Sequence, residues 1–361
     1  MDYKWIYNLK TNVLNFLKLM ESKDNPGFYR FSVKGDLYSE KSHWNLAGSV
    51  FALKILHMLQ HKDVKKINAA SDYIKTFIQE DNLIYDNFLH RKARYKRYFI
   101  SLKSFKSINY FAQKCKIAET RQSLSALMSF STLPDNFEVN FPQKKMEINN
   151  ILKKLDWSNP WSSGSHLSHL LFFLKAGYEL DQLSEANYNH LINYTIQYVD
   201  RLQNASDGAW YKGNPSMKIK INGAMKILTG FKVVNHTDIK YPKKLVDLCL
   251  EGINDETACD NFNILFVLNY ASKVLGRLYR TEEVKQFVIN RLRLYKKHYH
   301  PEFGAFSFYI KKSNTHYYGT KISQGLNEPD IHGTVMFLWG ISIAAQILGL
   351  SKEIEFTEQI A

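Results

Sequence analysis

The sequence has few of the residues that cross-link or interrupt a chain. Its 361 residues include three cysteines, Cys115, Cys249 and Cys259, a number that is odd and too small for a disulfide framework. We expect each to be a small buried apolar residue in a reducing compartment. Only eight prolines are present, and no Pro-rich or Ser/Gly-rich stretch separates two halves of different composition. We therefore expect a single domain over residues 1–361.

Long apolar runs are also scarce. The longest, residues 335–350, falls short of the roughly 20 residues that a membrane span needs, and small and polar residues interrupt it. The first residues, MDYKWI, contain no basic segment leading into an apolar core, so no secretory signal is visible. We expect no transmembrane segment and a cytoplasmic location, and peripheral contact with a membrane stays open.

The chain carries an excess of positive charge. Its 48 Lys and Arg outnumber 34 Asp and Glu, a net charge of +14. Such a surface attracts phosphate esters, acidic glycans, nucleic acid or anionic membranes, and charge alone does not choose among them. The excess is densest at residues 90–98, HRKARYKRY, where tyrosines alternate with basic residues. No nucleic-acid-binding motif accompanies this run, so we expect a solvated helix face and no clear nucleic-acid partner.

Helical periodicity dominates the chain. Apolar residues recur at spacings of three and four in several segments, starting with residues 2–20, whereas strand signals are confined to residues 217–221 and 305–310. More uniformly apolar helices alternate with these segments and start near a polar residue: Asn45, Gln122, His166, Asn222, Asp260 and His332. The pattern predicts an all-α fold, an α/α toroid of about six helical hairpins with inner and outer helix rings and short β-like turns in the loops.

Residues 203–210, QNASDGAW, carry a family resemblance. Gln203 ends a helix, and an Asp-Gly turn then brings in Trp210. The stretch resembles the glutamine and tryptophan repeats of terpenoid cyclases and protein prenyltransferases, and the residues 332–334 are similar to the prenyltransferase β-subunit helix that carries a zinc-binding histidine. The resemblance implies a toroid enzyme that binds an isoprenoid or another anionic substrate in a central cavity, where helix N-termini suit a diphosphate.

Residues 254–258, NDETA, suggest one chemistry. They resemble a degenerate form of the Asp-x-Asp-Asp-Thr-Ala motif of proton-initiated terpene cyclases, which implies that Asp255 is the acid and Glu256 its neighbour. Such an acid must be kept protonated by burial or by a nearby like charge. His166 and His332 are further candidate acid/base groups. The alternative is that the two acids only cap a helix and that each histidine makes structural hydrogen bonds.

The prenyltransferase resemblance also implies a zinc site. Its ligands would be Cys259 and His332 with Asp255 or Asp260, and the alternative for Cys259 is an unreactive packed thiol. Polar and aromatic residues at the helix starts and in nearby loops are the expected substrate-binding residues: Trp44, Asn45, Trp161, Asn222, Asp260, Glu328 and Asp330. For the tryptophans the alternative is a role as loop anchors between hairpins.

Two other functions fit the same scaffold. A ring of six hairpins also carries glycan-active enzymes, hydrolases, lyases or epimerases, which place carboxylates, histidines and aromatic residues at the ring mouth. The basic balance would suit an acidic polysaccharide. A toroid can also be a non-catalytic binding module, because a fold does not determine a function. We take the terpenoid cyclase-like enzyme as the first hypothesis, the glycan-active enzyme as the second and the binding module as the third.

Overall fold

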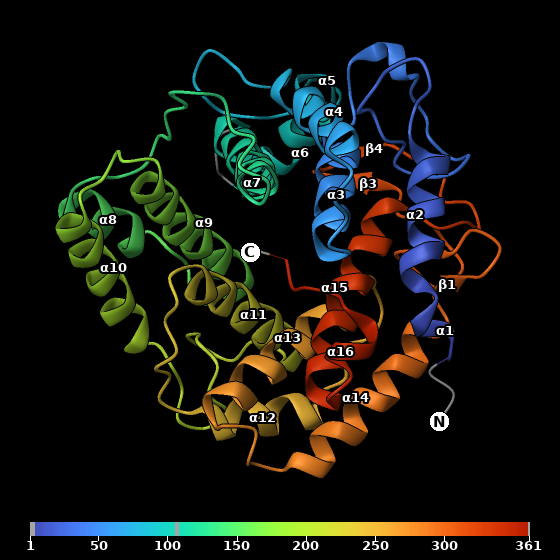
Figure 1. Cartoon of the computed structure of the whole chain (residues 1–361). Helices are drawn as coiled ribbons and strands as arrows, with labels where there is room; N and C mark the ends of the chain where they lie inside the picture. The colour runs from blue at the N-terminus through green and yellow to red at the C-terminus, as the bar shows by residue number, and fades with distance from the viewer. Residues whose placement is uncertain (1–3, 105–107, 360–361) are drawn as a thin grey trace. The chain divides into compact units, whose positions relative to one another are not determined.

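The computed structural model describes residues 4–104 and 108–359 (Figure 1). Helices account for 59% of the chain, which confirms the all-α class. The strands of the described chain are short antiparallel pairs in loops, as expected: β1 (Tyr299–His300) with β2 (Ala305–Phe306), and β3 (His316–Tyr317) with β4 (Thr320–Lys321). The other strand candidate, residues 217–221, is wrong. These residues open a helix, because the short polar and apolar alternation is followed by a longer run of helical pattern.

Contacts divide the chain into two compact units, which are described separately. Unit 1 comprises residues 1–135, 257–259 and 292–360, and unit 2 comprises residues 136–256 and 260–291. The expectation of one domain stays a prediction.

Unit 1 is built around α3 (Leu46–Met58), which packs on α4, α7 and α15 and is buried at every position but His57. The other helices of the unit are α1 (Lys4–Tyr7), α2 (Leu9–Met20), the 3-10 helix η1 (Glu40–Ser42), α4 (Val64–Lys75), α5 (Asn87–Lys92), α6 (Arg94–Ser104), α7 (Ile108–Met128), α15 (Ile331–Leu348) and α16 (Ser351–Ile354). The four strands also belong to this unit.

Polar caps set the starts of the two most apolar helices. Asn45 has a left-handed backbone (φ 65°), and its Oδ1 accepts a hydrogen bond from the amide of Gly48 at 3.0 Å. Asp330 caps α15 in the same way, through the amide of Gly333 at 2.7 Å. The predicted starts near Asn45 and His332 are therefore confirmed. The predicted helix start near Gln122 is wrong. Helix α7 begins at Ile108 and continues through Gln122, because no helix-breaking residue lies between them.

Helix α15 is long and apolar enough to cross a membrane, and 72% of that apolar stretch is buried inside the protein. Such burial is typical of the core helix of a globular unit. The described residues therefore contain no clear transmembrane segment, and the cytoplasmic location stays a prediction.

Unit 2 contains α8 (Lys145–Lys153), α9 (Pro160–Glu179), α10 (Glu185–Asp200), α11 (Met217–Val233), α12 (Pro242–Glu251), most of α13 (Ala258–Val274) and most of α14 (Thr281–Lys296). Helices α9 and α11 approach closely. A Cβ added at Gly223 on α11 would lie only 2.7 Å from the Cβ of Pro160 on α9. His166 and Asn222 lie inside these two helices, not at their starts. Helix α9 begins earlier, at Pro160 after the cap Asn159, and α11 begins after Ser216.

The stretch 203–210 connects elements within unit 2. Gln203 donates from Nε2 to the carbonyl of Gly208 at 2.9 Å and accepts at Oε1 from the amide of Lys240 at 3.0 Å. The fully buried ring of Trp210 meets Phe231 edge to face, with centroids 5.9 Å apart. These residues tie the end of α10 to the segment before α12, so their role here is architectural.

Candidate functional site

Asp255 and Glu256 lie before α13. Asp255 is half-buried, and its backbone carbonyl accepts a hydrogen bond from Asn261 Nδ2 at 3.0 Å. Glu256 is exposed, with its carboxylate 2.7 Å from Lys218 Nζ, which also contacts Asp260 at 3.1 Å. An acid that must stay protonated needs a less polar setting than an exposed ion pair. The predicted proton-donor role of Asp255 stays a prediction.

Asn222 and Asp260 belong to a buried network of amides in unit 2. Asn222 donates from Nδ2 to Asp260 Oδ1 at 3.4 Å, and its Oδ1 accepts from Asn254 Nδ2 and Asn263 Nδ2, each at 2.9 Å. Asp260 forms an ion pair with Lys218, so its side chain is a carboxylate, which only accepts hydrogen bonds. Asn222 must therefore turn its Nδ2 toward Asp260 and its Oδ1 toward the Nδ2 groups of Asn254 and Asn263. The network brings together two predicted substrate-binding residues.

His332 lies in the first turn of α15, in a box of rings. Its imidazole stacks on Phe51, with centroids 4.8 Å apart and planes 13° apart, and Nδ1 lies 3.1 Å from Asn314 Nδ2. An amide nitrogen only donates, so Nδ1 is the acceptor. The rings around it belong to Phe31, Phe51, Phe308 and Tyr317.

Two predicted substrate-binding carboxylates are engaged by backbone amides. Asp330 Oδ2 accepts from Phe308 at 2.8 Å and from Asn314 at 3.0 Å, and Glu328 accepts from the amides of residues 34 and 35 at 2.9 and 2.8 Å. Burial raises the pKa of Asp330 to about 7, although the amides counteract this in part. Both carboxylates join loops within unit 1, and their substrate-binding role stays a prediction.

The remaining predicted residues are dispersed. Trp44 is fully buried, Trp161 is 45% exposed, and His166 and Cys259 are half-buried. Within residues 4–104 and 108–359, no three His, Cys, Asp or Glu side chains gather where they could hold a metal ion. The zinc hypothesis therefore has no grouped ligand set in the described part of the chain.

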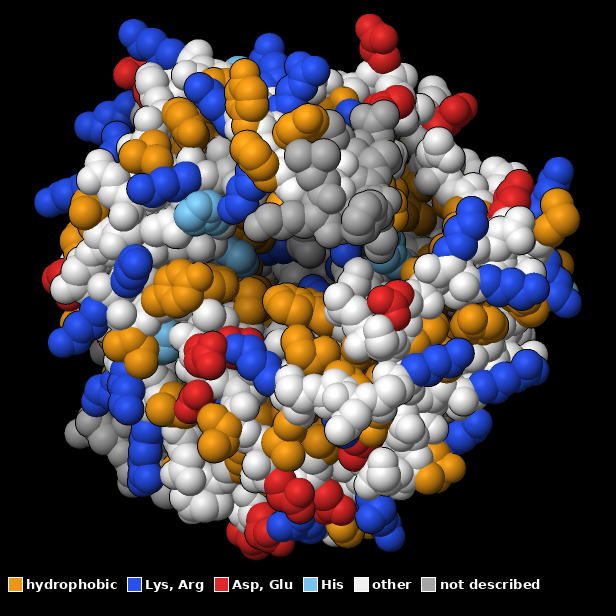
Figure 2. Space-filling model, turned by 180° about the vertical axis from the view of Figure 1, so that it is seen from behind, with side chains coloured by type: hydrophobic (Ala, Val, Ile, Leu, Met, Phe, Trp, Pro, Cys, Tyr) orange, Lys and Arg blue, Asp and Glu red, His pale blue; other side chains and the backbone are white. Residues whose placement is uncertain are grey.

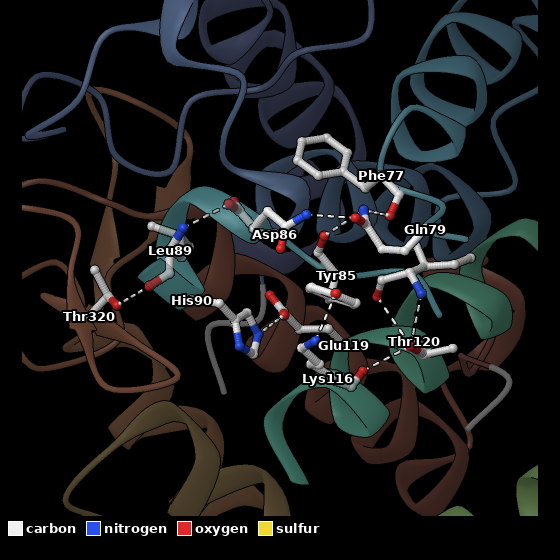
Figure 3. Close-up of polar contacts among 12 residues, drawn as sticks. Phe77, Gln79, Tyr85, Asp86, Leu89, His90, Lys116, Glu119, Thr120 and Thr320 are labelled. Carbon is white, nitrogen blue, oxygen red and sulfur yellow. Dashed lines mark hydrogen bonds and ion pairs between the residues drawn. The ribbon is translucent and has the colours of Figure 1, made fainter. Parts of the chain in front are cut away.

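Unit 1 contains a buried polar cluster that the sequence patterns did not single out, and Figure 3 shows Asp86, His90 and Glu119 of this cluster. We call Asp86, His90, Arg97 and Glu119 the Glu119 cluster. Asp86 caps α5, His90 lies in that helix, Arg97 lies in α6 and Glu119 lies in α7. All four side chains are buried, and Lys116 and Tyr85 border them.

The imidazole of His90 is held between Arg97 and Glu119. Arg97 Nη1 lies 2.9 Å from Nδ1, and Glu119 Oε2 lies 2.7 Å from Nε2. A guanidinium only donates, so Nδ1 accepts and the ring proton is on Nε2, which donates to Glu119. Burial and the charge of Arg97 lower the pKa of His90 to about 3. His90 is therefore neutral, and its tautomer is fixed.

Glu119 is a carboxylic acid that burial keeps protonated. Glu119 is 2% exposed, and this burial raises its pKa to about 8. The backbone amide of Asp86 and the charge of Arg97 lower the pKa and so offset part of the rise. Oε2 accepts the hydrogen bond from His90, so a proton on Oε1 keeps this contact in its most favourable form. Oε1 is buried and has no hydrogen-bond partner among the described residues.

Asp86 is the second carboxyl group of the cluster. Its oxygens accept hydrogen bonds from the amides of Leu89 at 2.9 Å and Asn45 at 2.7 Å, contacts that favour the ionised form. Burial is the main cause that raises the pKa of Asp86 to about 7, and Glu119 adds to this rise only when it is ionised. Burial therefore raises the pKa of both carboxyls of the cluster, and the two groups differ in the backbone amides that contact them.

A strained hairpin borders the cluster. The turn between β3 and β4 places Tyr318 at φ 42° and Gly319 at φ 90°, a pair of values that normally selects Gly or Asn. The hairpin is tied to α5 by Thr320 Oγ1, which donates to the carbonyl of Leu89 at 2.9 Å. Burial raises the pKa of the Tyr318 hydroxyl, and an ionised Glu119 would raise it further, so that side chain lies near the acid. Strain of this kind often marks functional sites.

The basic run at residues 90–98 differs in part from the predicted solvated face. Arg91, Lys92 and Lys96 are exposed, but His90 and Arg97 are buried. The two buried residues are seven apart, so they lie on one face of the helical segment. The sequence of α7 did contain an indication of the Glu119 cluster. Glu119 interrupts a run of small residues that is typical of a packed helix.

Comparisons with family models, with curated proteins and with solved structures give no match.

Proposed function

We propose that this chain is an enzyme that donates a proton from Glu119 to its substrate. The observation that carries the proposal is the hydrogen-bond series from Arg97 through His90 to Glu119, which leaves the acidic proton on Oε1. General acid catalysis works best when the pKa of the acid lies near the working pH. In this proposal His90 and Arg97 are positioning residues, because they orient the carboxyl and exchange no proton with the substrate.

Asp86 is the proposed base. Its two amide contacts favour the carboxylate, whereas Glu119 is kept protonated by burial. A proton taken up by Asp86 and one released by Glu119 would balance a reaction that breaks one bond to oxygen and forms another. Pairs of carboxyls with divided roles are the usual equipment of enzymes that cleave glycosidic bonds.

We infer further that the fold is of the α/α toroid type. Within each unit, helices buried on most sides alternate along the chain with helices buried along one face. Helices α3, α9, α11 and α15 are of the first kind, and α2, α4, α10 and α12 are of the second. This alternation supports an inner and an outer ring of helices.

The substrate class that these residues favour is an acidic glycan. Near the acid, Lys116 donates to the Tyr85 hydroxyl at 2.7 Å and lies 3.9 Å from the centre of that ring, so cationic, hydrogen-bonding and aromatic groups occur together. Lys and Arg side chains also spread over much of the face shown in Figure 2, where Asp and Glu form smaller groups. A polyanionic sugar chain would be attracted to such a surface.

A second candidate is the terpenoid cyclase or prenyltransferase-like activity on an isoprenoid diphosphate. The ring box around His332 favours it, because aromatic faces stabilise a nearby cation. Under this reading Glu119, rather than Asp255, would protonate an alkene.

The test compares wild type, Glu119→Gln and Glu138→Gln, a control at an exposed loop residue. Each is incubated with oligosaccharides of uronic acids, with neutral oligosaccharides and with farnesyl diphosphate, and products are followed by mass spectrometry. We expect turnover of the uronic acid chains by wild type and the control, and a loss of at least about 100-fold in Glu119→Gln, the usual contribution of a general acid. Unchanged turnover in Glu119→Gln would overturn the proposal. Binding without turnover in wild type would favour the binding module.

A further inference from the structure

Helix α6 presents three aromatic side chains to solvent. Tyr95 is 80% exposed, Phe99 is 63% exposed, and Tyr98 is exposed as well. Residues three and four apart lie on the same face of a helix, so these rings share one face of α6. Contiguous exposed apolar patches are rare on globular proteins, and where they occur they mark interaction sites. The exposed rings of α6 therefore call for a partner.

The opposite side of α6 attaches the helix to the rest of unit 1. Arg97 is buried and donates from Nη1 to Nδ1 of His90 at 2.9 Å, and the helix packs on α5 and α7. Arg97 is two residues from Tyr95 and two from Phe99, a spacing that turns it to the other side of the helix. The buried guanidinium thus fixes which face of α6 points outward, and that face bears the rings.

Positive charge borders the rings on both sides. Arg94 and Lys96 are exposed and flank Tyr95 in sequence, so their side chains lie at the two edges of the aromatic face. The sequence contains no Asp or Glu between Asp86 and Glu119. Such a concentration of one sign of charge attracts an anionic partner. The partner must therefore combine negative charge with a region that accepts apolar rings.

The arrangement of the side chains favours lipid over nucleic acid. Successive bases of a single strand stack on the open faces of aromatic rings. Here Tyr98 and Phe99 meet edge to face, with planes 75° apart, so they offer no pair of parallel platforms. Ile100, next to Phe99, is also exposed, and an aliphatic side chain does not stack on a base. An anionic membrane supplies phosphates for the basic residues and an apolar boundary for the rings, where tyrosine is especially common.

We propose that the outer face of α6 docks the protein on a membrane surface rich in anionic lipids. This face consists of Arg94, Tyr95, Lys96, Tyr98 and Phe99. The helix lies along the membrane, with the rings at the boundary between headgroups and acyl chains and the two cations beside lipid phosphates. The inference goes beyond the proposed function and does not depend on it, since none of these residues belongs to the Glu119 cluster.

The experiment measures co-sedimentation of the full chain with vesicles of phosphatidylcholine that contain about one third phosphatidylserine, or none. We expect wild type to bind the anionic vesicles, to bind them more weakly as salt is added, and to leave the neutral ones in solution. The double variant Tyr95→Ala with Phe99→Ala should bind at least about tenfold more weakly. In Arg94→Gln with Lys96→Gln, each lost charge should weaken binding by about fivefold.

Two controls separate this face from general properties of the surface. Lys62→Gln with Lys65→Gln removes the same charge at exposed positions elsewhere in unit 1, and Leu278→Ala removes an exposed apolar side chain from unit 2. Both should bind as wild type does. All the altered side chains are exposed, so every variant should melt at the temperature of wild type, which shows that a loss of binding is not a loss of folding.

Several results would overturn the inference. Wild type could fail to bind the anionic vesicles, either α6 variant could bind them as wild type does, or the paired lysine control could lose as much binding as the arginine and lysine variant, which would make the effect one of net charge. A parallel titration uses a single-stranded RNA oligonucleotide. If wild type binds the RNA and not the vesicles, and the α6 variants lose that binding, the face is a nucleic-acid interface and membrane docking is wrong.

Discussion

Arg97 donates a hydrogen bond to Nδ1 of His90 at 2.9 Å, and this one contact decides which nitrogen of the imidazole carries the proton. Because an arginine never accepts, His90 can donate only from Nε2, and this donation to Oε2 of Glu119 favours Oε1 as the oxygen that carries the acidic proton. The acid is thus oriented by a residue on another helix that need not touch the substrate.

Removing Arg97 should change the pH dependence of the proposed reaction. In Arg97→Met, Nδ1 is free to take up a proton, and the loss of a nearby positive charge raises the pKa of His90 from about 3. A protonated His90 favours ionised Glu119, so at mildly acidic pH turnover by Arg97→Met should fall below turnover by wild type. The check is a profile of kcat against pH together with histidine NMR titration. Arg91→Met, at an exposed position of α5, is the control, and a profile of Arg97→Met that matches it would contradict this account.

Glu119 should make wild type less stable as pH rises. Its folded pKa of about 8 lies above the ordinary value of 4.5, so between these values the folded protein keeps a proton that the unfolded chain has lost. Unfolding free energy therefore falls with rising pH across this window. Glu119→Gln removes the effect, and urea denaturation between pH 6.5 and 9 should give it a flatter pH dependence than wild type. This range avoids the opposite effect of His90, whose lowered pKa costs stability below pH 6.5. Equal slopes would show that Glu119 is ionised when folded.

Asn222→Ala should destabilise the protein by about 2–3 kcal/mol, since it removes the acceptor of two buried amides and one donor to Asp260. Chemical denaturation measures the change. Asn193→Ala, at an exposed position of α10, should alter stability by no more than about 0.5 kcal/mol. If Asn222→Ala changed the stability as little as Asn193→Ala does, water would replace the side-chain amide of Asn222 without loss of stability.

Gly333→Ala should cost about 1–3 kcal/mol, the usual range for overpacking. A Cβ at this position would lie 2.5 Å from the backbone nitrogen of Phe308, which donates to Asp330. At Gly349 the new Cβ would meet no atom within 4 Å, so Gly349→Ala should lose only about 1 kcal/mol, from its left-handed backbone at φ 74°. Thermal denaturation of the two variants compares these costs, and a smaller loss at Gly333 than at Gly349 would show that the loop moves aside freely.

The helices were largely predictable because caps and periodicity are local. Asn45 and Asp330 precede apolar runs, and both cap helices in the structure. Asn222 and His166 were placed at helix starts because the loops before them are polar and aromatic, whereas the helices begin a turn or more earlier. Sequence spacing alone does not separate the first turn of a helix from the end of a loop.

The site was much less predictable, because its parts come from distant positions. The sequence around Glu119 indicates only that this acid lies in a packed helix, and its contact with His90, together with burial, makes it a candidate proton donor. Asp255 and Glu256 drew attention through a motif, but motifs do not report burial.

The order of the chain has a consequence for synthesis. Unit 1 takes its residues from both ends of the sequence, with unit 2 between them. Thr320, which holds the hairpin to α5, and Asp330, which caps α15, are synthesised after every residue of unit 2 from 136 to 291. Unit 2 can therefore fold while unit 1 is still incomplete, and the hairpin that borders Glu119 joins α5 only after that. In a chain cut before residue 316, Glu119 would be present without this hairpin, so the burial that raises its pKa depends on a segment about 200 residues further along the sequence.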